Sequence, residues 1–301
     1  MYKELELFAK NLGAEVQTDA PMSKYTSFKA GGNASILITP DSLDTLKRTV
    51  SFCRENNVKM FIIGNGSNLL VTDKGFDGAI IKIGSSLSSI ELVGDCTVKC
   101  EAGASMKSLC MFALENSLSG LEFAYGIPGT LGGAVYMNAG AYGGEMKDVL
   151  ESCSHIDNKG AFGTLSKEEL NLSYRRSAYT DNGFVITSAI LKFKKGVKED
   201  IKAAMDDKLM RRRAKQPLEY PSAGSTFKRP EGYFAGALIE ESGLKGYSVG
   251  GAQVSEKHAG FVINKGGATA SDIISLIKHI QNTVFEKYSV SLEPEVKIIG
   301  E

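Results

Sequence analysis

The sequence predicts an α+β fold with more than one domain, and three observations support this prediction. The chain has 301 residues, of which 43% are apolar and 23% charged, enough for two or three domains that each have a core. Stretches with the apolar spacing of helices and of strands both occur along its length. The 33 glycines gather in a few segments, which indicates backbone that approaches something closely or takes positive φ angles.

Residues 1–84 are predicted to form a compact unit of helices and strands. Residues 1–12 mix charged and apolar side chains at the spacing of an amphipathic helix. Asp41 or Ser42 is expected to cap a second helix. Strands are expected at residues 36–39, 60–63 and 78–83. The apolar face of the second helix would consist of Leu43, Leu46, Val50 and Cys53.

Residues 85–196 are predicted to add a second region of helix and sheet. A strand at 97–101 precedes a helix capped by Ser105. Residues 118–144 then form a long stretch dominated by small side chains. A hairpin is expected around the turn at 158–160, followed by a long apolar strand at 184–193.

A change in composition near residue 196 places the main domain boundary there. Residues 197–215 have the character of a charged helix, and a new α/β segment begins after Pro217. This segment is expected to contain a helix at 234–242, a strand at 259–264 and a final strand at 296–299. Thr269 and Asp272 have the spacing of a capping box, which predicts another helix between the two strands.

Charge and hydropathy argue against several classes of function. The 35 basic and 35 acidic residues balance, which gives no support to nucleic-acid binding or a membrane-surface role. No apolar run reaches the length of a transmembrane helix, and the N-terminus is unlike a secretory signal. The cytoplasm is therefore the expected compartment, and no protein partner can be inferred.

The five cysteines are expected to be small buried side chains rather than ligands or disulfide partners. Their number is odd and no two have the CxxC spacing, so neither a disulfide framework nor a metal site is expected. They are Cys53, Cys96, Cys100, Cys110 and Cys153.

The segment Gly64–Asn68, with the sequence GNGSN, follows a predicted buried strand. Two glycines allow backbone N–H groups to converge on an anion, and a serine and an asparagine add side-chain donors, which suits a pyrophosphate. A simple β-turn uses the same residues, so the segment alone leaves both interpretations open. It has neither the GxGxxG pattern nor a Walker lysine.

The segment Gly126–Glu145 holds seven glycines and almost no charge. A packed core normally uses branched apolar side chains, so a stretch this small-sided leaves room for a flat, bulky partner such as a flavin ring. A tight crossing of two backbones is the alternative.

Seven segments together resemble the UDP-N-acetylenolpyruvoylglucosamine reductase family (MurB), and they occur in the family's order across nearly the whole chain. Any one of them is a weak signal, whereas all seven in order are specific. They are YTSFKAGGNA (25–34), GNGSN (64–68), GIPGTLGGAVYMNAGAYG (126–143), SYRRSAY (173–179), AGSTFKRP (223–230), LKGYSVGGAQVSEKHAGFVIN (244–264) and LEPEV (292–296).

This resemblance implies a two-subdomain FAD-binding fold of the vanillyl-alcohol-oxidase (PCMH-type) class plus a C-terminal α/β substrate-binding domain. The expected divisions are 1–84 and 85–196 for the FAD-binding subdomains and 197–301 for the substrate domain, whose last strand is expected to return to the first subdomain. NADPH would reduce non-covalent FAD, which would pass hydride to a UDP-sugar enolpyruvate. The residues expected to bind FAD are Gly64, Asn65, Gly66, Ser67, Asn68, Gly126, Ile127, Pro128, Gly129, Gly132, Gly133, Asn138, Ala139 and Gly140.

The same resemblance implies a catalytic set of three residues. Ser225 matches the family's acid in the GS-x-F-K motif and would protonate carbon, as a general acid must after hydride addition. Arg175 matches the YR motif and would pair with the substrate carboxylate, although residue chemistry alone does not separate it from Arg176. Glu295 matches the second glutamate of E-P-E-V and would support the enol intermediate.

Substrate binding is expected to depend on cations. Lys215 and Lys245 match the family's nucleotide-anchoring lysines, and His258 occupies a position near the substrate carboxylate. Arg229 replaces an asparagine that many members carry, so its role toward the phosphates is open. The chain also lacks the tyrosine-loop insert of one branch of the family, which leaves the closing element open among Tyr220, Tyr233 and Tyr247.

Two other functions fit part of the pattern. Another flavoprotein of the same fold, an oxidase or alcohol dehydrogenase, would keep both glycine-rich segments but need a different C-terminal site. A UDP-sugar or flavin-binding sensor would keep the scaffold without the chemistry. The joint presence of Arg175, Ser225 and Glu295 favours the reductase.

Overall fold

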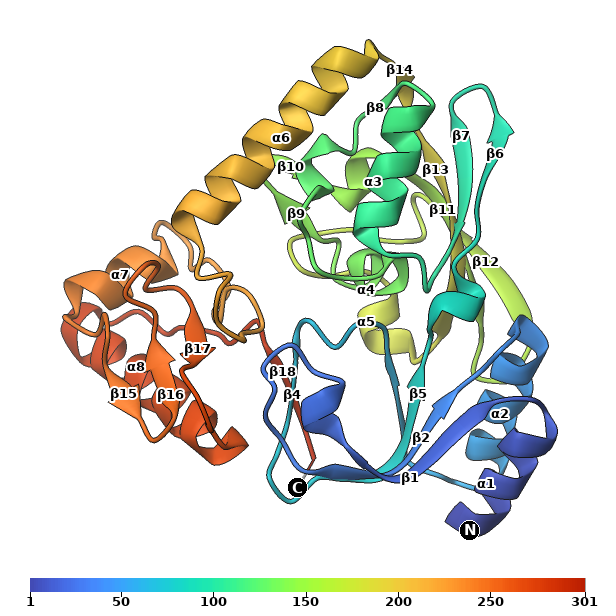
Figure 1. The fold of residues 1–301 in the computed structure, drawn as a ribbon, viewed down its shortest axis with the longest axis horizontal. Coiled ribbons are helices and arrows are strands. Elements are labelled where there is room, and N and C mark those ends of the chain that lie inside the picture. The colour runs from blue at the N-terminus through green and yellow to red at the C-terminus, as the bar shows by residue number, and fades with distance from the viewer. Residues whose placement is uncertain (301) are drawn as a thin grey trace. The chain divides into compact units, whose positions relative to one another are not determined.

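The computed structural model describes residues 1–300, and the chain divides into two compact units, which Figure 1 shows as a ribbon. Unit 1 consists of Met1–Thr18, Ile36–Asn65 and Gly78–Arg212. Unit 2 consists of Asp19–Ser35, Gly66–Asp77 and the chain from Arg213 onward. Each unit is assembled from three separate stretches of sequence, and the GNGSN segment passes from one unit into the other between Asn65 and Gly66.

A four-stranded sheet in the order β1-β2-β5-β3 carries the N-terminal region, with α1 (Tyr2–Asn11) and α2 (Leu43–Glu55) beside it (Figure 1). Strands β3 and β5 run parallel, and the rings of Phe8 and Phe52 stack 4.6 Å apart between the two helices. The expected helices and the three expected strands are confirmed; β1 was not expected. The strands are β1 (Glu15–Pro21), β2 (Asn33–Thr39), β3 (Met60–Ile63) and β5 (Phe76–Lys82).

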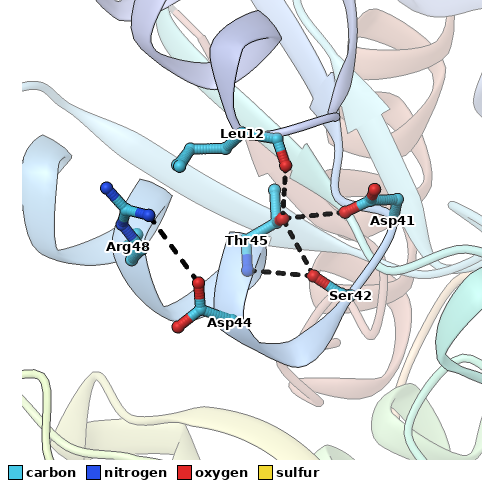
Figure 2. Close-up of polar contacts among 6 residues, drawn as sticks. All are labelled: Leu12, Asp41, Ser42, Asp44, Thr45 and Arg48. Atoms are coloured by element: carbon cyan, nitrogen blue, oxygen red, sulfur yellow. Dashed lines mark hydrogen bonds and ion pairs between the residues drawn. The ribbon is translucent and has the colours of Figure 1, made fainter.

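Helix α2 begins in a small network of hydroxyl and carboxylate groups, shown in Figure 2. Of the two expected caps, Ser42 is the one used: its hydroxyl accepts a hydrogen bond from the Thr45 N–H at 3.2 Å. The Thr45 hydroxyl lies 2.7 Å from Asp41 Oδ1 and 2.9 Å from the Leu12 carbonyl oxygen, and its hydrogen bond lowers the pKa of Asp41. This network ties the end of α1 to the start of α2.

The expected apolar face of α2 is confirmed except at Leu43. Leu46, Val50 and Cys53 are fully buried, whereas Leu43 is 37% exposed. Leu43 is the first residue of the helix, directly after the cap, and it precedes the turn whose apolar stripe reaches the core.

A five-stranded sheet in the order β12-β11-β13-β7-β6 forms the rest of the unit 1 framework, and its neighbouring strands are antiparallel. The expected hairpin is confirmed as β11 and β12, and the expected long strand as β13. Helix α3 (Met106–Glu115) is capped by Ser105 as expected. The strands are β6 (Ile90–Gly94), β7 (Thr97–Glu101), β11 (Leu150–Ile156), β12 (Phe162–Ser166) and β13 (Val185–Lys192).

The stretch of small residues contains a helix that was not expected, α4 (Leu131–Tyr136). Its buried residues Leu131, Ala134 and Val135 do have helical spacing, but two adjacent glycines hide the pattern. The expected charged helix is confirmed as α6 (Lys198–Lys215), a single long helix in Figure 1, and the last stretch of unit 1 ends within it at Arg212. The shorter elements are β8 (Leu118–Ser119), β9 (Gly140–Ala141), β10 (Gly144–Glu145), α5 (Tyr179–Asn182) and β14 (Lys194–Lys195).

Unit 2 packs two helices with a three-stranded antiparallel sheet in the order β15-β16-β17. The final strand β18 (Lys297–Ile299) pairs in parallel with β4 (Leu69–Val71), directly after the GNGSN segment (Figure 1). The two expected helices are confirmed. The other elements are α7 (Ala235–Glu241), β15 (Ser248–Val249), β16 (Ala252–Val254), β17 (Val262–Asn264) and α8 (Ala270–Tyr288).

Two carboxylates satisfy the N–H groups at the start of α8. Thr269 and Asp272 form the expected capping box. Asp73 adds a second carboxylate from the loop after β4, and accepts from Ala270 N–H at 2.8 Å and Ser271 N–H at 2.7 Å. The loop after β4 is thereby fixed to the long helix of its own unit.

The cysteines behave as small core residues. All five are free thiols, four of them buried and Cys96 half-buried. Burial raises the pKa of the Cys53 and Cys100 thiols to about 12, so these thiols stay protonated and unreactive at neutral pH. None of the helices within residues 1–300 combines the length and apolar character needed to cross a bilayer.

Candidate functional site

The first glycine of the GNGSN segment lies against the start of the second glycine-rich segment. A Cβ added at Gly64 would stand 2.2 Å from Thr130 Oγ1, so the chain leaves no room for a side chain there. Thr130 is buried and precedes α4. Two segments far apart in the sequence, both expected to bind FAD, therefore meet within unit 1.

Gly66 is required for two further reasons. Its φ is +59°, and an added Cβ would stand 2.1 Å from the Tyr25 carbonyl oxygen. The Gly66 carbonyl in turn accepts a hydrogen bond from the Ser27 N–H at 3.1 Å. The loop is thus held in shape by the neighbouring segment of unit 2, and Asn65 remains exposed at its tip.

The two adjacent glycines of α4 face different surroundings. An added Cβ at Gly132 would lie 3.1 Å from Ala102 Cβ, whereas at Gly133 the nearest atom is Thr130 Oγ1 at 3.9 Å. Gly132 is therefore a close crossing within the protein, but nothing in residues 1–300 requires a glycine at exposed position 133. A glycine inside a helix is destabilising relative to alanine. An uncrowded Gly133 is what a flat cofactor lying against the backbone would need, so the segment fits FAD.

Arg175 lies at the tip of a tight hairpin in unit 1. Ser173 and Arg176 exchange backbone hydrogen bonds of 3.0 and 3.2 Å across the turn, which leaves Tyr174 and Arg175 between them. Arg175 has a φ of +55°, a conformation that glycine or asparagine normally takes in a turn and that costs an arginine about 1–3 kcal/mol. A strained side chain held in one place is common at functional sites.

The Arg175 hairpin is tied to the small-residue segment by side chain to backbone contacts. Asn138 Nδ2 donates to the Ser173 carbonyl at 3.0 Å, and the Ser177 hydroxyl donates to the Tyr136 carbonyl at 2.8 Å. Arg175 Nη1 itself reaches the Gly140 carbonyl at 3.4 Å. The structure therefore brings the expected carboxylate-binding arginine together with expected FAD-binding residues.

Asn138 has a structural task that the sequence did not reveal. It is 1% exposed with a φ of +43°. Its Nδ2 also donates to Glu145 Oε2 at 2.5 Å, and its Oδ1 accepts from the Lys147 N–H at 2.9 Å. The side chain thus joins three parts of the loop, and binding of FAD by Asn138 stays a prediction.

Arg175 and Arg176 differ in a way that the sequence left open. Arg176 is exposed and forms an ion pair with Asp181 at 2.5 Å, so a surface carboxylate accounts for it. Arg175 is half-buried and stacks its guanidinium over the Tyr174 ring at 5.3 Å. The local contacts agree with the choice of Arg175.

Ser225 and Glu295 are brought together in unit 2 by backbone pairing. Phe227 and Pro294 form an isolated antiparallel bridge. On one side of it the Glu295 N–H donates to the Thr226 carbonyl at 2.8 Å, and on the other the Lys228 N–H donates to the Glu293 carbonyl at 2.8 Å. The peptide bond of the candidate carboxylate is therefore hydrogen-bonded to the neighbour of the candidate acid.

The two glutamates of the E-P-E-V motif are distinguished by their contacts. Glu293 is exposed and forms an ion pair with Lys228 at 2.5 Å. Glu295 is half-buried. Ser225 is exposed, while the hydroxyl of its fully buried neighbour Thr226 accepts a hydrogen bond from the Val262 N–H at 2.9 Å. Thr226 thus fixes the backbone that presents Ser225.

Three of the four expected substrate-binding residues lie within electrostatic range of one another in unit 2. Burial lowers the pKa of His258, and the charges of Lys245 and Lys215 lower it further, against an opposing effect of Glu240. His258 Nδ1 accepts from the Gly260 N–H at 3.1 Å, so the neutral ring carries its proton on Nε2. Lys245 forms an ion pair with Glu240 at 2.7 Å.

Arg229 has a different setting. Its guanidinium lies 4.0 Å from the centre of the Phe234 ring, and its Nε donates to the Tyr233 carbonyl at 3.4 Å. Tyr233 and Phe234 are exposed. Among the other tyrosines considered for closure, Tyr220 lies under Lys265 and Tyr247 stacks on His279.

Arg212 is a second residue whose setting the sequence did not reveal. It belongs to the charged helix expected at residues 197–215, and its Cδ lies 3.3 Å from where a Gly126 Cβ would stand. Burial lowers its pKa, against an opposing effect of Tyr142. Its neighbour Arg211 is instead exposed and paired with Asp207. Arg213 and Lys215 also have no acidic residue three or four positions earlier on the helix, so no sequence signal singles out Arg212.

A family model described as an FAD-binding domain matches residues 34–166. The chain is thus an FAD-binding protein, and the expected cofactor is confirmed. A second model, the C-terminal domain of UDP-N-acetylenolpyruvoylglucosamine reductase, matches residues 216–299. Together they confirm the predicted fold class, an α+β FAD-binding fold followed by a C-terminal domain.

The similarity to known proteins extends over almost the whole chain. A UDP-N-acetylenolpyruvoylglucosamine reductase of Clostridium perfringens is 53% identical over 286 residues, which are 95% of this chain and 93% of the relative. One of Clostridium botulinum is 54% identical over the same shares. The crystal structure of a reductase of this name (MurB) from Thermus caldophilus matches with a TM-score of 0.82 at 36% identity, and covers 95% of this chain and 99% of that one. The chain belongs to the UDP-N-acetylenolpyruvoylglucosamine reductase family.

Proposed function

We propose that this protein reduces UDP-N-acetylglucosamine enolpyruvate to UDP-N-acetylmuramate for peptidoglycan synthesis, with NADPH as the hydride donor. Family membership over 95% of the chain supports the reaction. The observation that carries the catalytic assignment is the 2.8 Å hydrogen bond from the Glu295 N–H to the Thr226 carbonyl. It holds a carboxylic acid and a serine hydroxyl on adjoining backbone, and protonation of an enolate needs a general acid within reach of the carbon.

The residues proposed to hold FAD come from both glycine-rich segments. When bound, FAD supplies the transfer of hydride from NADPH to the vinyl group of the substrate. In unit 1 these residues are Gly64, Asn65, Gly126, Ile127, Pro128, Gly129, Gly132, Gly133, Asn138, Ala139 and Gly140, and in unit 2 they are Gly66, Ser67 and Asn68.

Arg175 acts on the substrate carboxylate. Negative charge spreads into that carboxylate as hydride adds to the neighbouring carbon, and a fixed guanidinium stabilises this charge more in the transition state than in the ground state. The strained hairpin and its ties keep the guanidinium from adapting to the ground state, which supports this role.

Ser225 gives its proton to the carbon that carries the charge, and Glu295 donates a hydrogen bond to the enol intermediate when protonated. The diphosphate of the UDP-sugar is neutralised by Lys215, Lys245 and Arg229. His258 lies beside the carboxylate of the substrate's enolpyruvyl group. The lowered pKa of His258 keeps its ring neutral at pH 7, with the Nε2 proton available to donate.

The division of the chain into parts 1–84, 85–196 and 197–301 is also a proposal, as is a location in the cytoplasm. The division rests on the change in composition near residue 196 and on the family resemblance, and the location fits the proposed reaction. The first two parts would serve the cofactor and the last the UDP-sugar, and the cytoplasm holds NADPH and nucleotide sugars.

Anaerobic spectroscopy of the purified, FAD-loaded protein tests the proposal. NADPH should bleach the flavin absorbance, and the enolpyruvyl UDP-sugar should restore it. Ser225→Ala should leave bleaching nearly intact and slow the recovery by about 10²–10³-fold. Protein that binds no FAD, or recovery that does not depend on this substrate, would reject the function; equal losses in both steps would make Ser225 structural.

A further inference from the structure

Asn68, the last residue of the GNGSN segment, contacts the segment that carries Glu295. Its Nδ2 donates to the Glu295 carbonyl at 3.0 Å. Its own carbonyl accepts from the Lys297 N–H at 3.1 Å. Immediately after these contacts, Leu69 pairs with Lys297 in the parallel ladder of β4 and β18. The side chain of Asn68 thus extends the hydrogen bonding of this ladder to the backbone carbonyl of Glu295.

Both polar groups of the Glu295 backbone are consequently fixed, each by a different segment. Its N–H bonds to Thr226, next to Ser225, and its carbonyl bonds to Asn68. The N–H belongs to the peptide group before the Glu295 Cα and the carbonyl to the one after it. The two hydrogen bonds therefore restrain the backbone on both sides of the Cα and set the direction in which the glutamate side chain leaves it. Pro294, which precedes Glu295, has no N–H group and its ring restricts its φ. It therefore cannot donate a backbone hydrogen bond in place of the Glu295 N–H.

We propose that Asn68 is a positioning residue for Glu295: the GNGSN loop, besides serving the cofactor, aims the carboxyl group that supports the enol intermediate. This inference rests on the proposed function, because it needs Glu295 to act in the step that consumes the enolpyruvyl substrate. An asparagine that only bound phosphate would affect cofactor affinity. One that also aims Glu295 additionally slows the second half-reaction, even when FAD is saturating.

Substitution of Asn68 separates these two roles, because it removes the side-chain hydrogen bond to the Glu295 carbonyl and keeps the backbone bond to Lys297. Asn68→Ala should slow reoxidation of the reduced flavin by substrate by about 10–100-fold, since a displacement near 1 Å costs catalysis on that order. Flavin reduction by NADPH, measured at saturating FAD, should be nearly unchanged. The FAD dissociation constant, measured by fluorescence quenching, should rise by a smaller factor than the reoxidation rate falls.

Two matched controls belong to the same experiment. Gln281→Ala removes another amide-to-carbonyl bond, 2.8 Å from Nε2 to the Leu292 carbonyl, in the same segment but away from Glu295. It should leave reoxidation nearly unchanged. Ser67→Ala lies in the GNGSN loop but has no described hydrogen bond to Glu295 within residues 1–300. It should weaken FAD binding without favouring either half-reaction.

Asn68→Asp supplies a pH signature that a merely structural role would not produce. The new carboxyl group has the same shape, but it can donate a hydrogen bond to the Glu295 carbonyl only when protonated. Its reoxidation rate relative to wild type should therefore rise as pH falls. This variant also decides the matter if Asn68→Ala does not fold.

A double-mutant cycle with Glu295→Gln completes the test. If Asn68 acts through Glu295, adding Asn68→Ala to Glu295→Gln should slow reoxidation little further. Additive losses, or equal slowing of both half-reactions at saturating FAD, would overturn the inference alone. Wild-type reoxidation in Glu295→Gln would instead reject the role proposed for Glu295, on which the inference rests.

Discussion

The two units hold their candidate catalytic groups by different means. In unit 1, Arg175 stands on a strained two-residue turn that side chains fasten to neighbouring loops, with Asn138 as the buried link. In unit 2, Ser225 and Glu295 stand on adjoining backbone that main-chain hydrogen bonds pair, and the side chains of Thr226 and Asn68 add one hydrogen bond each. The cation is thus held by specific side chains and the acids by sheet-like pairing.

The difference follows from what each group must do. A guanidinium that stabilises developing charge gains from being unable to relax, and a positive φ keeps it in one place. A proton donor must reach carbon and be resupplied, so regular backbone with the hydroxyl exposed is sufficient. We therefore expect unit 1 to be sensitive to single side-chain changes and unit 2 to changes that break its backbone pairing.

The largest effect is expected at Arg175. Arg175→Ala should slow reoxidation by the enolpyruvyl substrate by about 10²–10³-fold, because one fixed donor to developing charge is lost. Arg176→Ala, its matched control, removes only an exposed ion pair and should stay within about 2-fold of wild type. Stopped-flow absorbance of the flavin measures both. Equal losses in the two variants would show that the hairpin does not select one arginine.

A smaller effect on activity, but a clear one on stability, is expected at Asn138. Asn138→Ala leaves the buried end of the Lys147 N–H bond without its acceptor and removes one of the two hydrogen bonds to the Ser173 carbonyl, which should cost about 1–3 kcal/mol in the free energy of unfolding. Because the Arg175 hairpin loses its tie, reoxidation should also slow while NADPH still reduces the flavin. Denaturant unfolding and the half-reactions check this. A free energy of unfolding equal to that of wild type would mean that the hairpin is held without Asn138.

Much of the scaffold could be predicted from the sequence, because local patterns determine it. Caps, the hairpin and the long strand follow from spacing alone, and so does the capping box at Thr269. Helix α4 was missed because Gly132 and Gly133 interrupt its apolar spacing. Strand β1 (Glu15–Pro21) was missed because only one of its residues, Ala20, is buried, so its pairing rather than its pattern makes it a strand.

The site was predicted only as far as motifs carry it. The roles of Asn68 and Asn138 depend on contacts between residues 35 or more apart, such as Asn138 to Ser173 and Asn68 to Glu295. Such long-range contacts cannot be inferred from the spacing of residues along the chain. The positive φ of Arg175 could not be foreseen either, because arginine has no preference for it. The division into three consecutive domains stays a prediction.

Asp73 offers a test of unit 2 that depends on pH. Burial alone would raise its pKa, but hydrogen bonds from Ser271 and from the Ala270 and Ser271 N–H groups lower it overall. A lowered pKa in the folded state means that the contribution to stability is complete above the ordinary value of 3.8 and is lost as pH falls through the folded pKa. Asp73→Ala should therefore destabilise the protein by about 1 kcal/mol at pH 7, discounted for the exposure of the group.

Urea unfolding of wild type and Asp73→Ala at several pH values measures this difference. The difference in the free energy of unfolding between wild type and Asp73→Ala should become smaller as pH is lowered from 5 toward 3, the range in which unpaired aspartates also titrate. Asp44→Ala is the control, because Asp44 is exposed and its ion pair with Arg48 spans 3.8 Å. A gap that does not depend on pH would mean that Asp73 contributes through packing alone.

The smallest effect on stability, and the sharpest test of the cofactor surface, comes from the adjacent glycines of α4. Gly133→Ala should stabilise the FAD-free protein by about 0.5–1 kcal/mol, because alanine favours a helix and the added methyl meets no close atom. Gly132→Ala should destabilise it, because the methyl would press on Ala102 at 3.1 Å. If Gly133 is glycine for the sake of FAD, its variant gains stability and loses FAD affinity together. An unchanged FAD affinity in Gly133→Ala would mean that the flavin does not lie against this part of α4.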